Sequence, residues 1–140
     1  MKILGLGVDI VNISRFDKLI NKKNANFIKR VFKQNELKNK KISGKLIAKK
    51  FAAKEAFSKA VGTGLGEFLS FKDICILNKK SGKPYIQLTK EINKKIKKKL
   101  KTKKLNIYLS ISDDSPWAMA FVILSSWLWK KKLLKIFIVF

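Results

Sequence analysis

Alternating side chains mark the beginning of the chain as a β-strand. One side of residues 2–11 carries Leu4, Leu6, Val8 and Ile10, and the other carries Ile3, Gly5, Gly7, Asp9 and Val11. Two glycines leave the second side short of side chains, which is typical of a strand approached closely by another backbone or by a ligand. Asp9 lies on that side, so its carboxylate needs a cation, hydrogen-bond donors or contact with water.

Four helices are expected from the spacing of apolar residues. They cover residues 15–23, residues 26–37, a long segment from about Ser43 to Val61, and the very basic segment 88–104. Asn12 or Ser14 is the expected cap of the first helix, and Ser43 caps the long one. The glycine-rich GTGLG after Val61 ends the long helix.

Four further strands are expected after the long helix. They cover residues 71–77, 84–88, 105–112 and 117–124, with a turn at Ser81-Gly82 in the first pair and DDSP in the second. No internal repeat or long linker interrupts the pattern. We therefore predict a single α+β domain over residues 1–124, followed by an apolar and basic tail over residues 125–140.

The two ends of the chain bear on its location. The tail contains no uninterrupted apolar segment of the roughly 18 to 20 residues that cross a bilayer. We interpret it as a last element packed on the core or on a partner subunit; the alternative is attachment to a membrane surface through its Trp, Lys and Phe side chains. The N-terminal apolar run is short, contains Asp9 and has no convincing cleavage site, so we expect a cytoplasmic protein.

Composition adds a strong positive charge to an otherwise ordinary globular chain. Of its 140 residues, 46% are hydrophobic and 30% charged, and the net charge is +24. Only Arg15 and Arg30 are arginines. The lysine excess reflects either compositional bias or selection for an anionic partner, and the sequence leaves both open. A single cysteine excludes an internal disulfide, and the absence of histidine excludes imidazole catalysis.

Glu55 is the second carboxylate expected to be partly buried. On the long helix it follows Phe51 and Ala52 by about one turn, which places it at the border of the buried face. A surface ion pair with Lys59, four residues on, is the simpler interpretation. If Asp9 and Glu55 meet, however, their repulsion calls for a cation, and Mg²⁺ suits two carboxylates together with water and substrate phosphates. The lysines of this helix would then hold further phosphate charge.

Five stretches of the chain resemble, in order and spacing, the holo-acyl-carrier-protein synthases, which are small 4'-phosphopantetheinyl transferases. They are GLGVDIV, FIKRVFKQNEL, FAAKEAFSKAVGTGLG, SGKPYIQL and LSIS. The resemblance covers roughly residues 2 to 124, and its specific part is the block with Lys54, Glu55 and Lys59 combined with Asp9. It implies an α+β fold with a small antiparallel sheet packed with a long helix, and homotrimers with active sites at subunit interfaces.

The resemblance also implies a reaction. Phosphopantetheine passes from coenzyme A to a serine of an acidic acyl carrier protein, leaving adenosine 3',5'-bisphosphate, in support of fatty acid biosynthesis. Asp9 and Glu55 match the ligands of Mg²⁺, Lys59 matches a lysine that supports the phosphates, and Arg15 matches a residue that contacts the carrier protein. The expected contacts of coenzyme A are Lys50, Lys54, Lys59, Gly62, Gly64 and Ser110. Lys50 stands where close relatives can carry arginine beside the 3'-phosphate, so a bidentate contact is lost here.

Two questions stay open at the level of the sequence. Asp113 matches a position where relatives often carry His or Asp; it is either the base that accepts the serine proton, directly or through water on the metal, or the cap of the DDSP turn. The whole chain could instead be a basic nucleic-acid-binding protein without enzymatic activity. Scarce arginines and the lack of an aromatic RNA-binding signature disfavour that alternative, so we expect no nucleic-acid partner.

Overall fold

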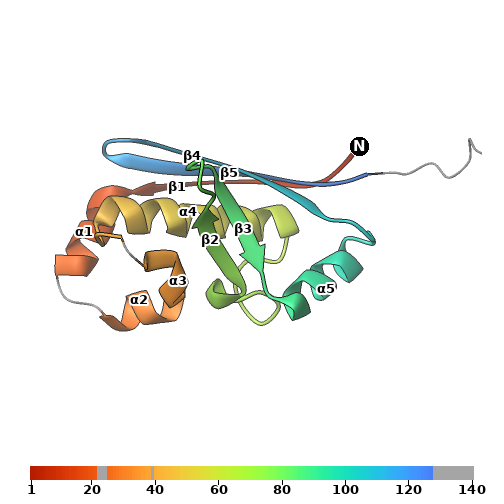
Figure 1. Ribbon diagram of the computed structural model, residues 1–140, viewed down its shortest axis with the longest axis horizontal. Coiled ribbons are helices and arrows are strands. Elements are labelled where there is room, and N and C mark those ends of the chain that lie inside the picture. The colour runs from red at the N-terminus through yellow and green to blue at the C-terminus, as the bar shows by residue number, and fades with distance from the viewer. Residues whose placement is uncertain (22–24, 39, 128–140) are drawn as a thin grey trace, which may run out of the picture.

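The computed structural model describes residues 1–21, 25–38 and 40–127 (Figure 1). Its helices are α1 (Ile13–Asn21), α2 (Ala25–Val31), α3 (Gln34–Leu37), α4 (Gly44–Val61) and α5 (Lys90–Lys99), with a 3-10 turn η1 (Phe71–Asp73). Its strands are β1 (Lys2–Asn12), β2 (Ile74–Asn78), β3 (Pro84–Leu88), β4 (Asn106–Asp114) and β5 (Trp117–Ser126). No helix within these residues is long and apolar enough to cross a membrane.

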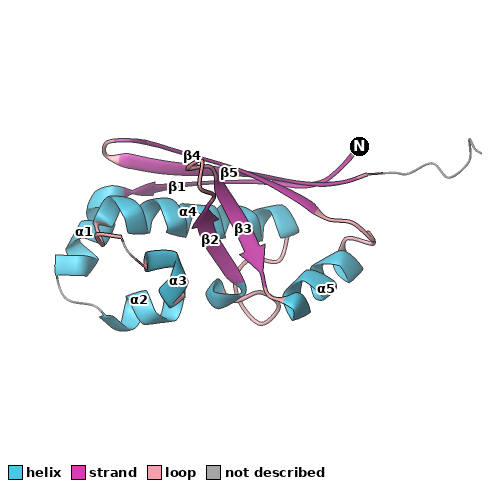
Figure 2. Cartoon of the chain, in the orientation of Figure 1, coloured by secondary structure: helices cyan, strands magenta, loops and turns pink. Residues whose placement is uncertain are grey.

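Two antiparallel sheets and the long helix α4 confirm the predicted α+β fold. The larger sheet has the strand order β1-β5-β4, and β2 pairs with β3 in a separate hairpin. Figure 2 shows α4 running along one face of the larger sheet, with α2 and α3 on the far side of the helix. The core lies between α4 and the sheet and is rich in alanine on the helix side, which allows a close approach.

Capping residues place the start of α1 and both ends of α4 close to the expected positions, whereas the helix expected over residues 88–104 is shorter, because α5 spans only Lys90–Lys99. Asn12 rather than Ser14 caps α1, because its side-chain oxygen accepts the N–H of Ser14 at 2.9 Å. Ser43 caps α4 by accepting the N–H of Leu46 at 3.2 Å, and Gly62 ends the helix with a φ of +76°. The segment 26–37 is not one helix but two, α2 and α3, separated by a break at residues 32–33.

The alternation predicted for β1 is correct from Gly5 onward and wrong before it. A register shift between Ile3 and Gly5 turns Leu4 toward the core and leaves Ile3 51% exposed. Beyond the shift, Gly5, Gly7, Asp9 and Val11 face α4 as expected, while Leu6 and its alternate neighbours face away from it. The last described residues of β5, Ser125 and Ser126, are buried and pair with the start of β1. The predicted role of the tail falls on residues 128–140, which lie outside the described residues.

Candidate active site

Backbone contact between β1 and α4 sets the position of the site. A Cβ atom on Gly5 would lie 1.9 Å from the carbonyl oxygen of Ala60, and one on Gly7 would lie 1.9 Å from that of Ala56. Only glycine fits at either position, because the obstructing atoms belong to helix backbone that does not move aside. Asp9 follows Gly7 on the same side of the strand, where it meets the flank of α4 that carries Glu55 and Lys59.

Asp9, Glu55, Lys59 and Arg15 form one charged cluster at this junction. Lys59 Nζ donates to Asp9 Oδ1 at 2.9 Å, and the Asp9 side chain is only 14% exposed. Burial raises the pKa of Glu55, and the charge of Asp9 raises this pKa further, while Lys59 and Arg15 act in the opposite direction. The structure therefore brings together the two acids, one from a strand and one from a helix, that the sequence analysis singled out.

The carboxylates of this cluster fit a magnesium ion. Asp9 Oδ2 is buried and has no hydrogen-bond partner, which is costly for a carboxylate oxygen unless a cation or donor reaches it. Oxygen donors of this kind are the ligands that Mg²⁺ prefers. Among the described residues no group of three or more acidic, His or Cys side chains could hold a metal ion. Two carboxylates alone leave the other coordination positions to water and to oxygens of a bound ligand.

The turn that follows α4 lies at the Lys59 end of the helix and contains two glycines with positive φ angles. Gly62 and Gly64 have φ angles of +76° and +65°, a backbone region that favours glycine. The Gly62 N–H donates to the carbonyl oxygens of Ser58 and Lys59, so it is used by the helix cap. No atom lies within 4 Å of a Cβ built on either glycine, and both residues are exposed. These glycines form an open turn at the Lys59 end of the helix.

Lys54 does not belong to the site, which corrects its predicted role as a phosphate contact. Its side chain is fully buried, and Nζ donates to Glu36 Oε2 at 2.8 Å. The same ammonium group also reaches three carbonyl oxygens, those of Val31, Phe71 and Ile74. All of its protons are engaged, so it has none to offer to a coenzyme.

Glu36 is the partner that the sequence analysis did not identify. Its Oε1 accepts the N–H of Ile76 at 3.0 Å, and its Oε2 accepts the N–H of Lys33 at 2.8 Å. Together Glu36 and Lys54 form a buried ion pair that ties α2, α3, η1 and β2 to α4. No local spacing reveals this pair, because its members lie 18 residues apart on helices separated by a loop.

Lys50 lines a different cavity, whose lining includes none of Asp9, Arg15, Glu55 and Lys59. The cavity has a volume of about 270 Å³, and its polar lining includes Lys40, Lys49, Lys50 and Asn78. Lys50 is 3% exposed and donates to the carbonyl oxygen of Ile76. Burial, followed by the charge of Lys40, lowers the pKa of Lys50 to about 8. A concave site with three lysines suits an anionic ligand.

Asp113 and Ser110 lie apart from the carboxylate cluster within one chain. In the register of the sheet Asp113 is opposite Ala118, two strands away from Val11, and its carboxylate binds Lys45 at 2.5 Å and Lys49 at 2.9 Å. Hydrogen bonds from these two lysines lower the pKa of Asp113. Ser110 is exposed and pairs with Phe121 on the face of the sheet that points away from α4.

Comparisons with a family model and with individual known proteins point to the same family. The family model of the 4'-phosphopantetheinyl transferase superfamily matches residues 5–122. The holo-[acyl-carrier-protein] synthase of Pelagibacter ubique is 54% identical over 127 residues, which cover 89% of this chain and 98% of that protein. The enzyme of the same name from Ruthia magnifica is 40% identical with the same coverage.

Solved structures agree with this comparison. The holo-[acyl-carrier-protein] synthase of Neisseria meningitidis superposes with a TM-score of 0.78 at 33% identity, covering 89% of this chain and all of that one. The Helicobacter pylori enzyme, solved in complex with coenzyme A, gives a TM-score of 0.73 at 35% identity, covering 86% of this chain and 99% of that one.

Proposed function

The chain belongs to the 4'-phosphopantetheinyl transferase superfamily, and on this premise we propose that it transfers 4'-phosphopantetheine from coenzyme A to a serine of an acyl carrier protein. In the reaction the serine oxygen forms a bond to the phosphopantetheine phosphorus. The bond from that phosphorus to the bridging oxygen of the diphosphate breaks, adenosine 3',5'-bisphosphate leaves, and the proton of the serine hydroxyl is released to water. The observation that carries the proposal is the ion pair of Asp9 and Lys59 at 2.9 Å, placed near enough to Glu55 for the charge of Asp9 to raise the pKa of Glu55.

Asp9 and Glu55 would hold Mg²⁺, with Lys59 beside them. When bound, Mg²⁺ neutralises and orients the diphosphate of coenzyme A. Asp9 offers its unpartnered buried oxygen, and Glu55 offers a carboxylate whose charge a cation would stabilise. Lys59 is 53% exposed, so its ammonium group would be free to turn from Asp9 toward a phosphate oxygen if the Asp9 carboxylate bound a metal ion.

The cavity around Lys50 is our proposed site for the nucleotide end of coenzyme A. Its lysines suit the 3'-phosphate, and the turn with Gly82 and Pro84 forms one wall. Asp113 is better suited to fixing Lys45 and Lys49 beside this cavity than to accepting a proton, because a lowered pKa makes a carboxylate a weaker base. We therefore assign it a positioning role in coenzyme binding.

The outer face of the larger sheet supports the proposal of a homotrimer. This outer face consists of Leu6, Val8, Ile10, Tyr108, Trp117 and Met119, each between 39% and 57% exposed. A contiguous apolar patch of this kind marks an interaction surface. Ser110 lies on the same face, so packing of a second copy there would bring it to the subunit interface where the resemblance places the active sites.

The cellular setting follows from the proposed reaction. We place the enzyme in the cytoplasm, where it would meet coenzyme A and an acidic carrier protein. Its role there would be to supply holo carrier protein for fatty acid biosynthesis. Arg15 and Lys18, which line a cavity of about 550 Å³ beside α1, are the proposed first contact with the carrier. The basic surface would accelerate the encounter and would do so less at high salt.

Mass spectrometry of an apo carrier protein incubated with this chain, coenzyme A and Mg²⁺ tests the proposal. We expect a gain of one phosphopantetheine per carrier, and its loss with Asp9→Ala or Glu55→Ala in folded protein. An unchanged carrier with the wild-type chain would overturn the proposed activity. Full activity of either folded variant would show that the carboxylate cluster is not the site.

A further inference from the structure

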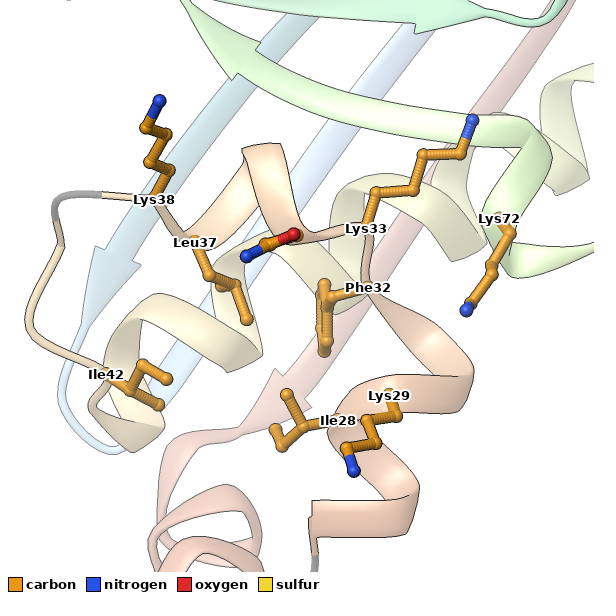
Figure 3. A pocket seen from close by; sticks show the side chains of 9 residues that line it. Ile28, Lys29, Phe32, Lys33, Leu37, Lys38, Ile42 and Lys72 are labelled. Carbon is orange, nitrogen blue, oxygen red and sulfur yellow. The ribbon is translucent and has the colours of Figure 1, made fainter.

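A groove bounded by α2, α3, η1 and the chain before α4 has no part in the site described above. Its volume is about 630 Å³. Figure 3 shows Phe32 and Leu37 in the middle of the view and Ile28 below them beside Lys29, with Lys38 on the opposite side from Lys33 and Lys72. The apolar floor consists of Ile28, Phe32, Leu37 and Ile42. We call it the α2–α3 groove.

The lysines around the α2–α3 groove have no acidic partners among the described residues. Lys29, Lys33, Lys38 and Lys72 line it, none of them takes part in an ion pair, and no carboxylate lies in its lining. The floor is apolar and partly open, since Ile42 is 45% exposed. The groove therefore offers apolar contact surrounded by positive charge, which suits a ligand with an apolar stripe and several negative charges.

The buried pair of Lys54 and Glu36 holds the walls of this groove in place. Lys54 Nζ binds the carbonyl oxygens of Val31, at the end of α2, and Phe71, in η1, next to Phe32 and Lys72 respectively. The ring of Phe32 lies over the same ammonium group at 5.1 Å. Because these walls are fixed before a ligand arrives, binding costs little conformational entropy.

We propose that the α2–α3 groove is a second docking surface for the acyl carrier protein, and that it receives an acidic amphipathic helix of that protein. This inference rests on the proposed function. Four lysines from separate segments match several carboxylates along a helix, whereas an anionic lipid with one head group would need only one or two of them. A second copy of this chain is poorly suited to supply several carboxylates to these lysines, because the sequence holds only nine acidic residues against 33 basic ones.

The α2–α3 groove lies close enough to the active site for one carrier protein to contact both at the same time. Phe27 lines the cavity with Arg15, and the next residue, Ile28, lines the groove, so α2 alone separates the two surfaces. Lys54, whose ammonium group lies under Phe32, is the neighbour of Glu55 in α4. Even a small domain of about 100 residues is about 30 Å across, which is enough to span α2.

The test compares charge reversal in the groove with charge reversal elsewhere. The groove variant carries Lys29→Glu, Lys38→Glu and Lys72→Glu, and the matched control carries Lys94→Glu, Lys95→Glu and Lys98→Glu on α5; all six lysines are exposed. Both variants lose the same charge, so general steering falls equally in the two. We expect the KM for apo carrier protein to rise about 10-fold more in the groove variant than in the control, with kcat and the KM for coenzyme A unchanged.

A binding assay without turnover separates this inference from the proposed function. Fluorescence anisotropy with a labelled carrier whose acceptor serine is replaced by alanine should show the same loss of affinity in the groove variant. Equal carrier affinity in the groove variant and the control would overturn the docking surface, even if the wild-type chain transfers phosphopantetheine. A rise in the KM for coenzyme A alone, or a changed oligomeric mass, would also overturn it. Carrier binding through the groove without any transfer would instead overturn the activity.

Discussion

Glu55 is an acid whose surroundings oppose its negative charge. Burial and the charge of Asp9 raise its pKa above the ordinary value of 4.5. Because the folded state then binds more protons than the unfolded chain, the free energy of unfolding contributed by Glu55 falls as pH rises from 4.5 through the raised pKa. At neutral pH without metal, this carboxylate destabilises the fold.

We expect Glu55→Gln to raise the Tm at pH 7 in the absence of Mg²⁺ by about 3 °C, because the repulsion from Asp9 disappears. Differential scanning calorimetry at fixed protein concentration measures the change. The gain should shrink at pH 4, where Glu55 is mostly protonated in both states. A lower Tm for the variant at pH 7 without metal would contradict this account of the cluster.

Lys50 predicts how coenzyme binding depends on pH. With a pKa of about 8 it is charged at pH 7 and largely neutral at pH 9. If it binds a phosphate, the KM for coenzyme A should rise up to about 10-fold between these pH values. Lys50→Arg, which keeps its charge throughout, should remove this rise. The same rise in both proteins would show that Lys50 does not titrate at the coenzyme site.

At the scale of elements, the strand β1 and the helix α4 were each easier to predict than the packing of one on the other. Alternation, caps and the glycine-rich stop were readable from the sequence. The glycines of β1 admitted either a close backbone or a ligand, and only the structure showed backbone contact with Ala56 and Ala60. The break between α2 and α3 was not predicted; Glu36, which accepts the N–H of Lys33 at the start of α3, also pairs with the distant Lys54, and contacts between distant residues leave no periodic pattern.

Gly7→Ala should separate β1 from α4. Its new Cβ would lie 1.9 Å from the carbonyl oxygen of Ala56 and 2.6 Å from the nitrogen of Ala60. We expect a loss of about 3 kcal/mol in the free energy of unfolding, measured by urea denaturation, because backbone must shift. Gly66→Ala is the control, since no atom lies within 4 Å of its Cβ and its φ is not positive. A Gly7→Ala protein as stable as the control would refute the close contact.

At the scale of the whole molecule, the sequence predicted the fold class and the pairing of acids, but not the distribution of lysines. Lys50, Lys54 and Lys59 looked alike on one helix, yet one lines a cavity, one is buried in an ion pair and one contacts Asp9. Their separation follows from the rotation of about 100° per residue along α4 and from what packs on each side. The alternation of β1 in the sequence indicated that Leu6, Val8 and Ile10 share one face, but it did not indicate that this face is exposed in the single chain.

Met119 on the outer face tests the proposed assembly. We expect the wild-type chain to have a mass of about 48 kDa by light scattering, three times 16.1 kDa, and Met119→Glu to shift it toward the monomer. A charge at the centre of a packed apolar interface would be buried without a partner. Ile42→Glu, which alters an exposed apolar residue away from this face, should leave the mass unchanged. A monomeric wild-type protein would contradict the assembly.

Binding of Mn²⁺ in place of Mg²⁺, counted by electron paramagnetic resonance in the presence of coenzyme A, tests the central claim most directly. If Asp9 and Glu55 hold the ion between them, the wild-type chain binds one Mn²⁺ per subunit, and Asp9→Asn and Glu55→Gln each weaken binding at least about 10-fold. Glu91→Gln, which changes an exposed acid on α5 away from the site, should bind as the wild type does. Wild-type Mn²⁺ affinity in both the Asp9 and the Glu55 variant would contradict the claim.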